Sequence, residues 1–291
     1  MRPRSILLAL MAIAMLVLVG VFIGTHSLKH SLPRVLPHAE YCTAQSGSNL
    51  VTLDIDQMAN AATIAAVGIR KGVPARAVQV ALATSLQESK LENLTGGDRD
   101  SVGLFQQRPS KGWGTRAQVS DPRYASSHFY GALLHVKGWQ SMTLTQAAQA
   151  VQRSAYPGAY AQWTDESDTL AKVLLGNATH AVDCYVGNTP VTRGAVALSA
   201  LTTDLKSDWG SLFDPVHEAD PDTIALSVED NQAGWQYAHW LVAHAQERGI
   251  MRVRFGNQQW TAKGGSWQSA GDPETAAPGE TVLAEVFGST V

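Results

Sequence analysis

The first 24 residues constrain this chain most, because residues 5–24 form a run of uncharged, mainly aliphatic side chains. In a helix, about 20 such residues span about 30 Å, which is the thickness of the hydrocarbon core of a membrane. Arg2 and Arg4 precede the run, and this order favours an N-terminus on the cytoplasmic side. We therefore predict a transmembrane anchor with a short cytoplasmic N-terminus over residues 1–24, and the bulk of the chain outside the cytoplasm.

A cleaved secretion signal is the alternative to an anchor. The apolar part of such a signal is shorter, roughly 7–15 residues, and it ends at small residues in an A-x-A pattern. Thr25-His26-Ser27 fits that pattern poorly, although Lys29 and Arg34 weaken the charge asymmetry that orients an anchor. The first case gives a single-pass membrane protein and the second a secreted form, and both leave the folded part extracytoplasmic.

The chain has two cysteines, Cys42 and Cys184, and both lie in the predicted exterior. Disulfide bonds persist outside the cytoplasm, so we predict a bridge between them. The alternative is a pair of unrelated buried thiols. Neither cysteine has sequence neighbours that would activate a thiolate, so we predict that both cysteines are structural.

Composition and patterning divide the chain into several parts. Hydrophobic residues make up 45% of the sequence and charged residues 16%, which is enough to build a packed core. The formal net charge of -3 gives no support to a nucleic-acid partner. The predicted parts are the anchor 1–24, an extracytoplasmic stem 25–53, a helical domain 54–185, a linker 186–200, and a small α+β domain of unknown function 201–291.

Strand patterns are nearly absent between residues 54 and 182, where apolar residues recur at helical spacing. Helices are expected over residues 59–68, 74–91, 122–134 and 145–154. The C-terminal part differs, because Gly256-Asn257 is typical of a hairpin turn and Gly249 of a helix end. There we expect strands over residues 224–228, 250–255, 258–261 and 281–287, and a helix over residues 235–248.

Glu88 is the residue whose setting points to chemistry. It lies near the end of an apolar helix, just before the glycine-containing stretch Thr95-Gly96-Gly97-Asp98. A carboxyl at such a place is partly desolvated, and desolvation favours the protonated form that a general acid needs. An isolated glutamate near a helix end is more often a solvated surface residue, so the neighbouring motifs have to decide between the two interpretations.

Two motifs carry a resemblance to a known family. Glu88-Ser89 ends the predicted helix, and Gly103-Leu104-Phe105-Gln106 follows. This pattern resembles the lytic transglycosylase and goose-type lysozyme superfamily, over roughly residues 56–175. The stretch 97–114 is also similar to a group of actinobacterial exported or phage-related transglycosylase-like proteins. The third family motif, Ala-Tyr-Asn-x-Gly, is only loosely matched by Ser154-Ala155-Tyr156.

The sequence pattern and the resemblance together predict a mainly α fold, with a lysozyme-like all-α domain after the N-terminal transmembrane helix and a small α+β domain behind it. It implies that Glu88 cleaves the β-1,4 linkage between N-acetylmuramic acid and N-acetylglucosamine in peptidoglycan, as acid and then as base. Ser89, Gln106 and Tyr156 would contact the sugar or orient Glu88. Trp113, Phe105 and Tyr124 are candidates for apolar sugar-ring contacts, with a core role as the alternative for each.

The product of this reaction depends on whether a second carboxylate lies near Glu88. A hydrolase needs a base that activates water, whereas lytic transglycosylases use the muramoyl C6 hydroxyl and release a 1,6-anhydro product. Asp98 and Asp100 follow Glu88 on the loop and are candidates for that base or for substrate contacts. The alternative is that both shape the loop, paired with Arg99 or Arg108. We expect the transglycosylase reaction.

Other mechanisms fit the sequence poorly. Neither cysteine is placed for a cysteine peptidase, and His239 and His244 are five residues apart and share no helix face for zinc. No phosphate-binding glycine motif is present, so we expect neither a metal nor a cofactor. The alternative function is a non-catalytic protein with a degenerate transglycosylase fold that binds peptidoglycan as a scaffold of a secretion, conjugation or cell-wall apparatus. Partners beyond glycan strands and membrane would then be proteins of that machinery.

Overall fold

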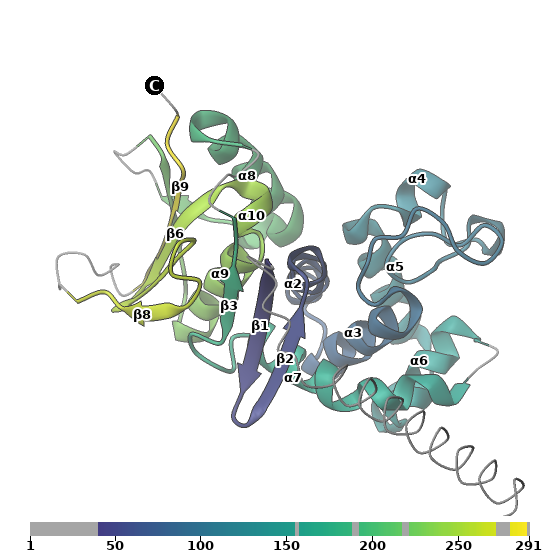
Figure 1. Ribbon diagram of the computed structural model, residues 1–291. Coiled ribbons are helices and arrows are strands. Elements are labelled where there is room, and N and C mark those ends of the chain that lie inside the picture. Colours follow the sequence, from purple (N-terminus) through teal and green to yellow (C-terminus); the bar gives the residue numbers. More distant parts are fainter. Residues whose placement is uncertain (1–39, 155–156, 188–191, 217–220, 272–279, 290–291) are drawn as a thin grey trace, which may run out of the picture. The chain divides into compact units, whose positions relative to one another are not determined.

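The computed structural model describes residues 40–154, 157–187, 192–216, 221–271 and 280–289. Residues 40–291 form one compact unit (Figure 1). The predicted transmembrane anchor and residues 25–39 of the predicted stem lie outside the described residues. In the part of the chain that is described, no helix is long and apolar enough to cross a membrane.

The unit begins with a three-stranded antiparallel sheet in the order β2-β1-β3. Strand β1 pairs with β2 on one side and with β3, which comes some 140 residues later, on the other. Cys42 and Ala44 of β1 are buried and alternate with less buried neighbours, as expected for a sheet with one covered face. The bounds are β1 Tyr41–Ser46, β2 Asn49–Leu53 and β3 Val182–Tyr185.

Helices follow the first two strands. Helix α3 begins after Pro74, whose extended backbone suits an N-cap position, and ends where Lys90 adopts a left-handed conformation with φ 58°. Its apolar stripe, including Val78, Leu82 and Leu86, is buried against the rest of the core. The helices up to β3 are α2 Ile55–Arg70, α3 Ala75–Ser89, α4 Arg116–Val119, α5 Pro122–His135, α6 Leu144–Gln152 and α7 Thr164–Leu174. The short 3₁₀ segments are η1 Pro109–Lys111, η2 Trp139–Ser141 and η3 Pro157–Trp163.

The C-terminal part contains a six-stranded antiparallel sheet in the order β4-β5-β9-β6-β7-β8. Helix α9 packs on β6 and β9, and the turn between β6 and β7 contains Gly256 at φ 55°. The strands are β4 Pro215–Val216, β5 Thr223–Ser227, β6 Ile250–Phe255, β7 Gln258–Thr261, β8 Trp267–Ser269 and β9 Thr281–Val286. The helices are α8 Gly194–Trp209, the 3₁₀ segment η4 Gly210–Leu212, α9 Asn231–Ala243 and α10 Ala245–Arg248, which ends at Gly249.

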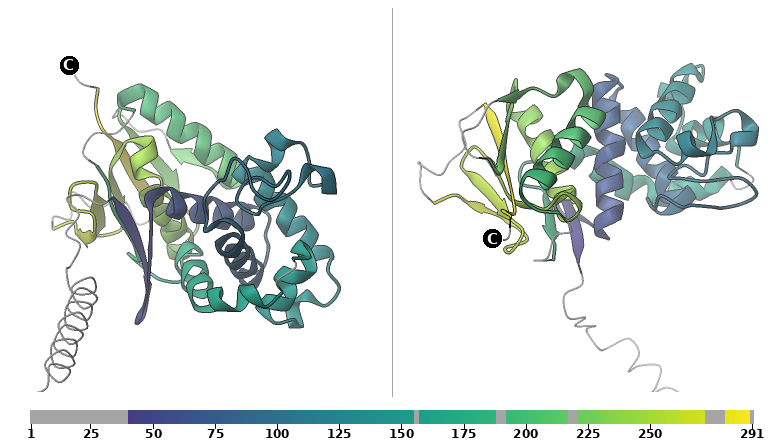
Figure 2. Two further views of the ribbon diagram at one scale, coloured as in Figure 1. Left: turned by 45° about the vertical axis from the view of Figure 1, so that its right-hand side comes forward. Right: turned by 90° about the horizontal axis from the view of Figure 1, so that it is seen from above.

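Helix α2 lies at the centre of this unit. It contacts α3, α5 and α7 on one side and α8 and α9 on the other, and Figure 2 shows it between the two groups. One continuous set of buried apolar residues runs from β1 through the helices into the six-stranded sheet, including Cys42, Met58, Trp209 and Trp260. The two parts of the chain therefore share one core.

The predicted fold class is wrong. The helical part is not all-α, because β1, β2 and β3 form a sheet on it, and two antiparallel sheets contribute to the unit. The last residues of the predicted stem form β1 and β2, and α8 begins inside the predicted linker. The physical reason is long-range pairing. Each strand of the small sheet is short, and only its partners show that it is a strand.

The predicted disulfide between Cys42 and Cys184 is confirmed. The two residues are direct partners in the antiparallel register of β1 and β3, and both are fully buried. The bridge closes a loop over a sequence separation of 142 residues. It therefore ties the strand that precedes the helices to the strand that follows them.

Candidate active site

Glu88 lies in the last turn of α3, and its side chain is half-buried. The helix ends at the next residue, Ser89, because Lys90 and Leu91 both have positive φ values, 58° and 62°. These two residues turn the chain away from the helix axis. Side-chain amides of α2 hold the turn, since Gln57 donates to the carbonyl of Lys90 and Asn60 to that of Leu91, each at 2.8 Å. The position of Glu88 is thus fixed by a helix end with satisfied carbonyls.

Ser89 joins this helix end to the second motif. Its buried hydroxyl shares its single proton between the carbonyl of Leu104, at 2.7 Å, and that of Ser85, at 3.1 Å. The hydroxyl of Ser85 donates to the same Leu104 carbonyl at 3.1 Å. The structure thus brings the Glu88-Ser89 pair and the 103–106 motif together. The hydrogen bonds of Ser89 go to backbone carbonyls, so Ser89 positions the loop.

The hydroxyl of Tyr160 donates to Oε1 of Glu88 at 2.7 Å. Tyr160 belongs to η3 and is fully buried. Burial and the neighbouring Glu88 carboxyl raise the pKa of Tyr160 far above its usual range, so its proton stays in place for this hydrogen bond. Tyr160 was not among the site residues predicted from the sequence. Ala159-Tyr160 repeats the Ala-Tyr pair of the third family motif four residues after the pair that was chosen, and that was the available signal.

Residues 162 and 163 also pack against the end of α3. Gln87 accepts hydrogen bonds from the indole of Trp163 at 2.9 Å and from the amide of Gln162 at 3.0 Å. The ammonium of Lys90 lies 3.9 Å from the centre of the Trp163 ring. Burial raises the pKa of the Glu166 carboxyl, and the charge of Lys90 opposes this. The residues on either side of the Glu88-Ser89 pair, Gln87 and Lys90, therefore both contact Trp163 of η3.

Gln106 lies in the loop that Ser85 and Ser89 hold. It has a positive φ of 46°, and its amide donates to the carbonyl of Gly103 at 3.1 Å. A methyl group on Gly97 would lie 1.7 Å from the amide oxygen of Gln106, so a larger residue at position 97 would displace the Gln106 side chain. The amide of Gln152, near the end of α6, donates to the carbonyl of Phe105 at 2.8 Å. The Gly97 loop, the motif loop and α6 therefore lock one another in place.

The two aspartates after Glu88 have different surroundings. Asp100 accepts from Arg108 at 2.8 Å and from the backbone and side chain of Ser110 at 2.7 and 3.0 Å. The guanidinium of Arg108 and the Ser110 donors hold the pKa of Asp100 well below its usual range. Asp98 is exposed and lies 3.9 Å from Arg99. Among the described residues, no hydrogen bond or ion pair joins either aspartate to Glu88, and their contacts favour the loop-forming alternative.

The remaining candidates lie as follows. Phe105 is fully buried and stacks on Phe129, so it is a core residue. Trp113 is half-buried against the core, and Tyr124 stacks on His128. Tyr156 lies outside the described residues. Within the described ranges, no group of three or more potential ligands is placed to hold a metal ion.

No protein-family model matches the chain, and no curated protein is similar to it. The resemblance to the transglycosylase superfamily therefore rests on the sequence motifs alone and stays a prediction.

Proposed function

We propose that this protein cleaves the glycan strands of peptidoglycan outside the cytoplasm, with Glu88 as its acid and base. The observation that carries the proposal is the hydrogen bond from Tyr160 to Glu88. A buried phenol that holds one carboxyl oxygen fixes the direction of the other. General acid catalysis depends on that kind of orientation, because the proton has to reach one particular oxygen of the substrate.

The reaction follows from these positions. Protonated Glu88 donates through Oε2, the oxygen that Tyr160 does not hold, to the oxygen of the glycosidic bond. The bond between that oxygen and the muramoyl C1 breaks and leaves an oxocarbenium-like centre. The Glu88 carboxylate then removes the proton from the group that attacks C1, and the residue returns to its protonated form.

The attacking group is proposed to be the C6 hydroxyl of the same sugar. A hydrolase would need a free carboxylate to activate water. Asp100 is held by Arg108 and Ser110, and Asp98 is an exposed residue beside Arg99. With both aspartates engaged in the loop, intramolecular attack and a 1,6-anhydro product are favoured over hydrolysis.

The test uses the full chain in detergent, on gels that contain purified peptidoglycan. The wild type is expected to clear the gel, and the Glu88→Gln variant, which keeps the size and the Tyr160 contact of the side chain, is expected not to. Mass spectrometry of the released fragments should find 1,6-anhydro ends. Reducing ends alone would contradict the transglycosylase reaction, and clearing by Glu88→Gln would contradict the role of Glu88. An absence of clearing together with glycan binding would support the non-catalytic scaffold instead.

A further inference from the structure

A pocket of about 450 Å³ opens on one face of α5. Ser127, His128 and Gly131 line it, and their spacing of three or four residues places them on the same side of the helix. Residues 111–113 of the loop around η1 also line it, and so does Lys71, the C-cap of α2. Pockets of this size take small molecules, and we call this one the α5 pocket.

The α5 pocket is separate from the candidate active site. Lys71 follows the C-terminal end of α2, whereas Asn60, near the other end of that helix, holds the Leu91 carbonyl of the Glu88 turn. At 1.5 Å per residue, positions 60 and 71 of α2 lie about 16 Å apart along the helix axis. Glu88, Gln106 and Tyr160 are not part of the pocket lining. An occupant of the α5 pocket would therefore not be the glycan that Glu88 is proposed to cleave.

The segment that supplies most of this pocket is basic. Residues 101–164 contain a single acidic residue, Asp121, although the net charge of the whole chain is -3. No carboxylate belongs to the described lining of the pocket. A local excess of positive charge favours an anionic occupant. The lysines and arginines of this segment are Arg108, Lys111, Arg116, Arg123, Lys137 and Arg153.

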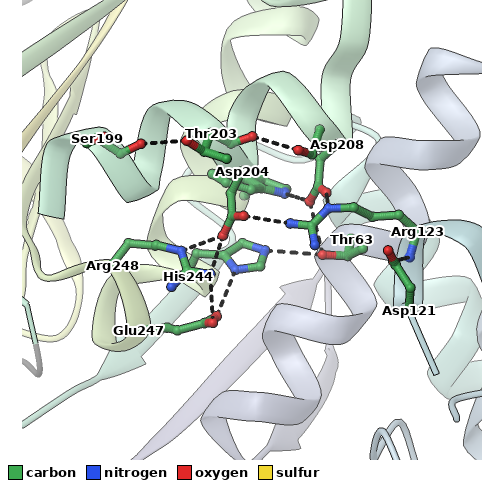
Figure 3. Close-up of polar contacts among 12 residues, drawn as sticks. Thr63, Asp121, Arg123, Ser199, Thr203, Asp204, Asp208, His244, Glu247 and Arg248 are labelled. Carbon is green, nitrogen blue, oxygen red and sulfur yellow. Dashed lines mark hydrogen bonds and ion pairs between the residues drawn. The ribbon is translucent and has the colours of Figure 1, made fainter. Parts of the chain in front are cut away.

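The two lysines of the α5 pocket are not neutralised by a carboxylate. Arg123 of the same segment is, because it pairs with Asp204 at 3.0 Å (Figure 3). In the part of the chain that the structure describes, neither Lys71 nor Lys111 forms an ion pair. The Lys71 ammonium donates to the hydroxyl of Ser127 at 3.2 Å, and this leaves two of its three donors for a ligand.

Gly131 lies in the interior of α5, where a glycine destabilises the helix relative to an alanine. Its φ is not positive, so the backbone does not require a glycine. Apart from its chain neighbours and the backbone of its own helix, no described atom lies within 4 Å of the place that a Cβ would take. Packing within the described protein therefore does not require a glycine either. A molecule that approaches the helix backbone from the pocket would require one.

The chemistry of the lining indicates the kind of molecule. Trp113 is half-buried in the lining, and its indole offers a flat apolar face to a sugar ring. Lys71 and Lys111 act as point charges, and two of them match a phosphate group, which carries about -1.5 to -2 charges at neutral pH. We propose that the α5 pocket binds a sugar that carries a phosphate group, with the phosphate at the two lysines and the ring against Trp113 and Gly131. This binding goes beyond the proposed function and does not depend on it.

Calorimetry on the full chain in detergent tests this inference with four probes, glucose 6-phosphate, glucose, glucuronate and inorganic phosphate. Glucose 6-phosphate is expected to bind about ten-fold more tightly than each of the others, because only it has both the ring and the doubly charged anion. Equal binding of glucose would overturn the role of the anion, and equal binding of glucuronate would overturn the choice of phosphate. Equal binding of inorganic phosphate would overturn the role of the ring, and no binding of any probe would overturn the site itself.

Three variants locate the site. Lys71→Gln and Lys111→Gln should each weaken the binding of glucose 6-phosphate about ten-fold, whereas Lys206→Gln, at an exposed lysine of α8, should leave it unchanged. Gly131→Leu should abolish the binding by filling the pocket, while the unfolding curve shows no loss of stability, because leucine favours a helix more than glycine does. Unchanged affinity in these three variants would overturn the inference. None of the probes has a glycosidic bond, so the result is independent of glycan cleavage by Glu88.

Discussion

The Tyr160 hydroxyl donates a 2.7 Å hydrogen bond to the Glu88 carboxyl, although the two residues are 72 positions apart. Glu88 comes from the last turn of α3 and Tyr160 from η3, two elements that pack against each other. The contact joins the end of α3 to a segment that follows α6. It makes Tyr160 the positioning residue of the candidate site.

Replacing Tyr160 with phenylalanine keeps the buried ring and removes the hydroxyl. Glu88 then loses the contact that orients it, so we expect kcat for glycan cleavage to fall roughly ten- to hundred-fold with little change in KM. The release of soluble fragments from purified peptidoglycan measures this. Tyr185→Phe, at an exposed tyrosine of β3, is the control and should behave like the wild type. An equal rate for Tyr160→Phe would show that the contact does not matter.

Ser89→Ala removes a hydroxyl that is buried between α3 and the motif loop. Leu104 keeps the hydrogen bond from Ser85, so we expect a loss of about 1 kcal/mol in the free energy of unfolding. Urea unfolding measures it. Thr203→Ala removes a hydroxyl that also donates to a carbonyl four residues back, but on an exposed helix face, and should cost less than about 0.5 kcal/mol. Equal losses in the two variants would contradict a special role of Ser89.

His239 predicts how stability depends on pH. Burial lowers its pKa from 6.5 to about 4. The Ala181 N–H donates to Nε2 of the ring at 3.0 Å, and Nδ1 lies 2.9 Å from the carbonyl oxygen of Val173. Between these pKa values the unfolded chain binds more protons than the folded chain. The contribution of neutral His239 to the free energy of unfolding is therefore complete above pH 6.5 and is lost as the pH falls towards 4. At about 1.36 kcal/mol per pH unit, the loss from pH 6.5 to 5 is about 2 kcal/mol.

The measurement is urea unfolding at pH 6.5 and pH 5. The wild type should lose about 2 kcal/mol more over this range than His239→Gln, which has no group that titrates there. His135→Gln, at an exposed histidine, should follow the wild type. If the wild type and His239→Gln show the same pH dependence, His239 is not held neutral in the folded state.

The disulfide predicts a large effect of reduction. The loop that the bond closes is long, so removing the disulfide bond should lower the free energy of unfolding by about 3–5 kcal/mol. Urea unfolding of the double variant Cys42→Ala with Cys184→Ala, with and without a reductant, measures this. The reductant should shift the wild type and leave the double variant unchanged. A wild type that is insensitive to reductant under unfolding conditions would contradict the bridge.

The local elements of the fold were predictable from sequence. Strands β6 and β7 have the predicted bounds, because Gly256 marks the turn and the flanking residues alternate. Helix α3 was expected over residues 74–91 and observed over 75–89, since Pro74 and the apolar stripe mark it. Patterns within a dozen residues were sufficient for these elements.

The small sheet was not predictable in the same way. Strand β1 contains Thr43, Gln45 and Ser46 among its six residues, and its identity depends on pairing with β3 far along the chain. The candidate site divides likewise. The sequence singled out the Glu88-Ser89 pair and the motif that contains Leu104, whereas the contact with Tyr160 depends on the fold of η3. Helix α8 was not predicted, and its first residues fall within residues 186–200, which were interpreted as a linker.

The central claim is that Glu88 cleaves glycan strands, and the initial rate of soluble fragment release from purified peptidoglycan tests it most directly. The wild type, Glu88→Gln and the control Glu229→Gln are compared as full chains with matched unfolding curves. General acid catalysis predicts that Glu88→Gln is slower by about 100-fold or more, while Glu229→Gln equals the wild type. A Glu88→Gln rate within about two-fold of the wild type, where a general acid should contribute far more, would contradict the account.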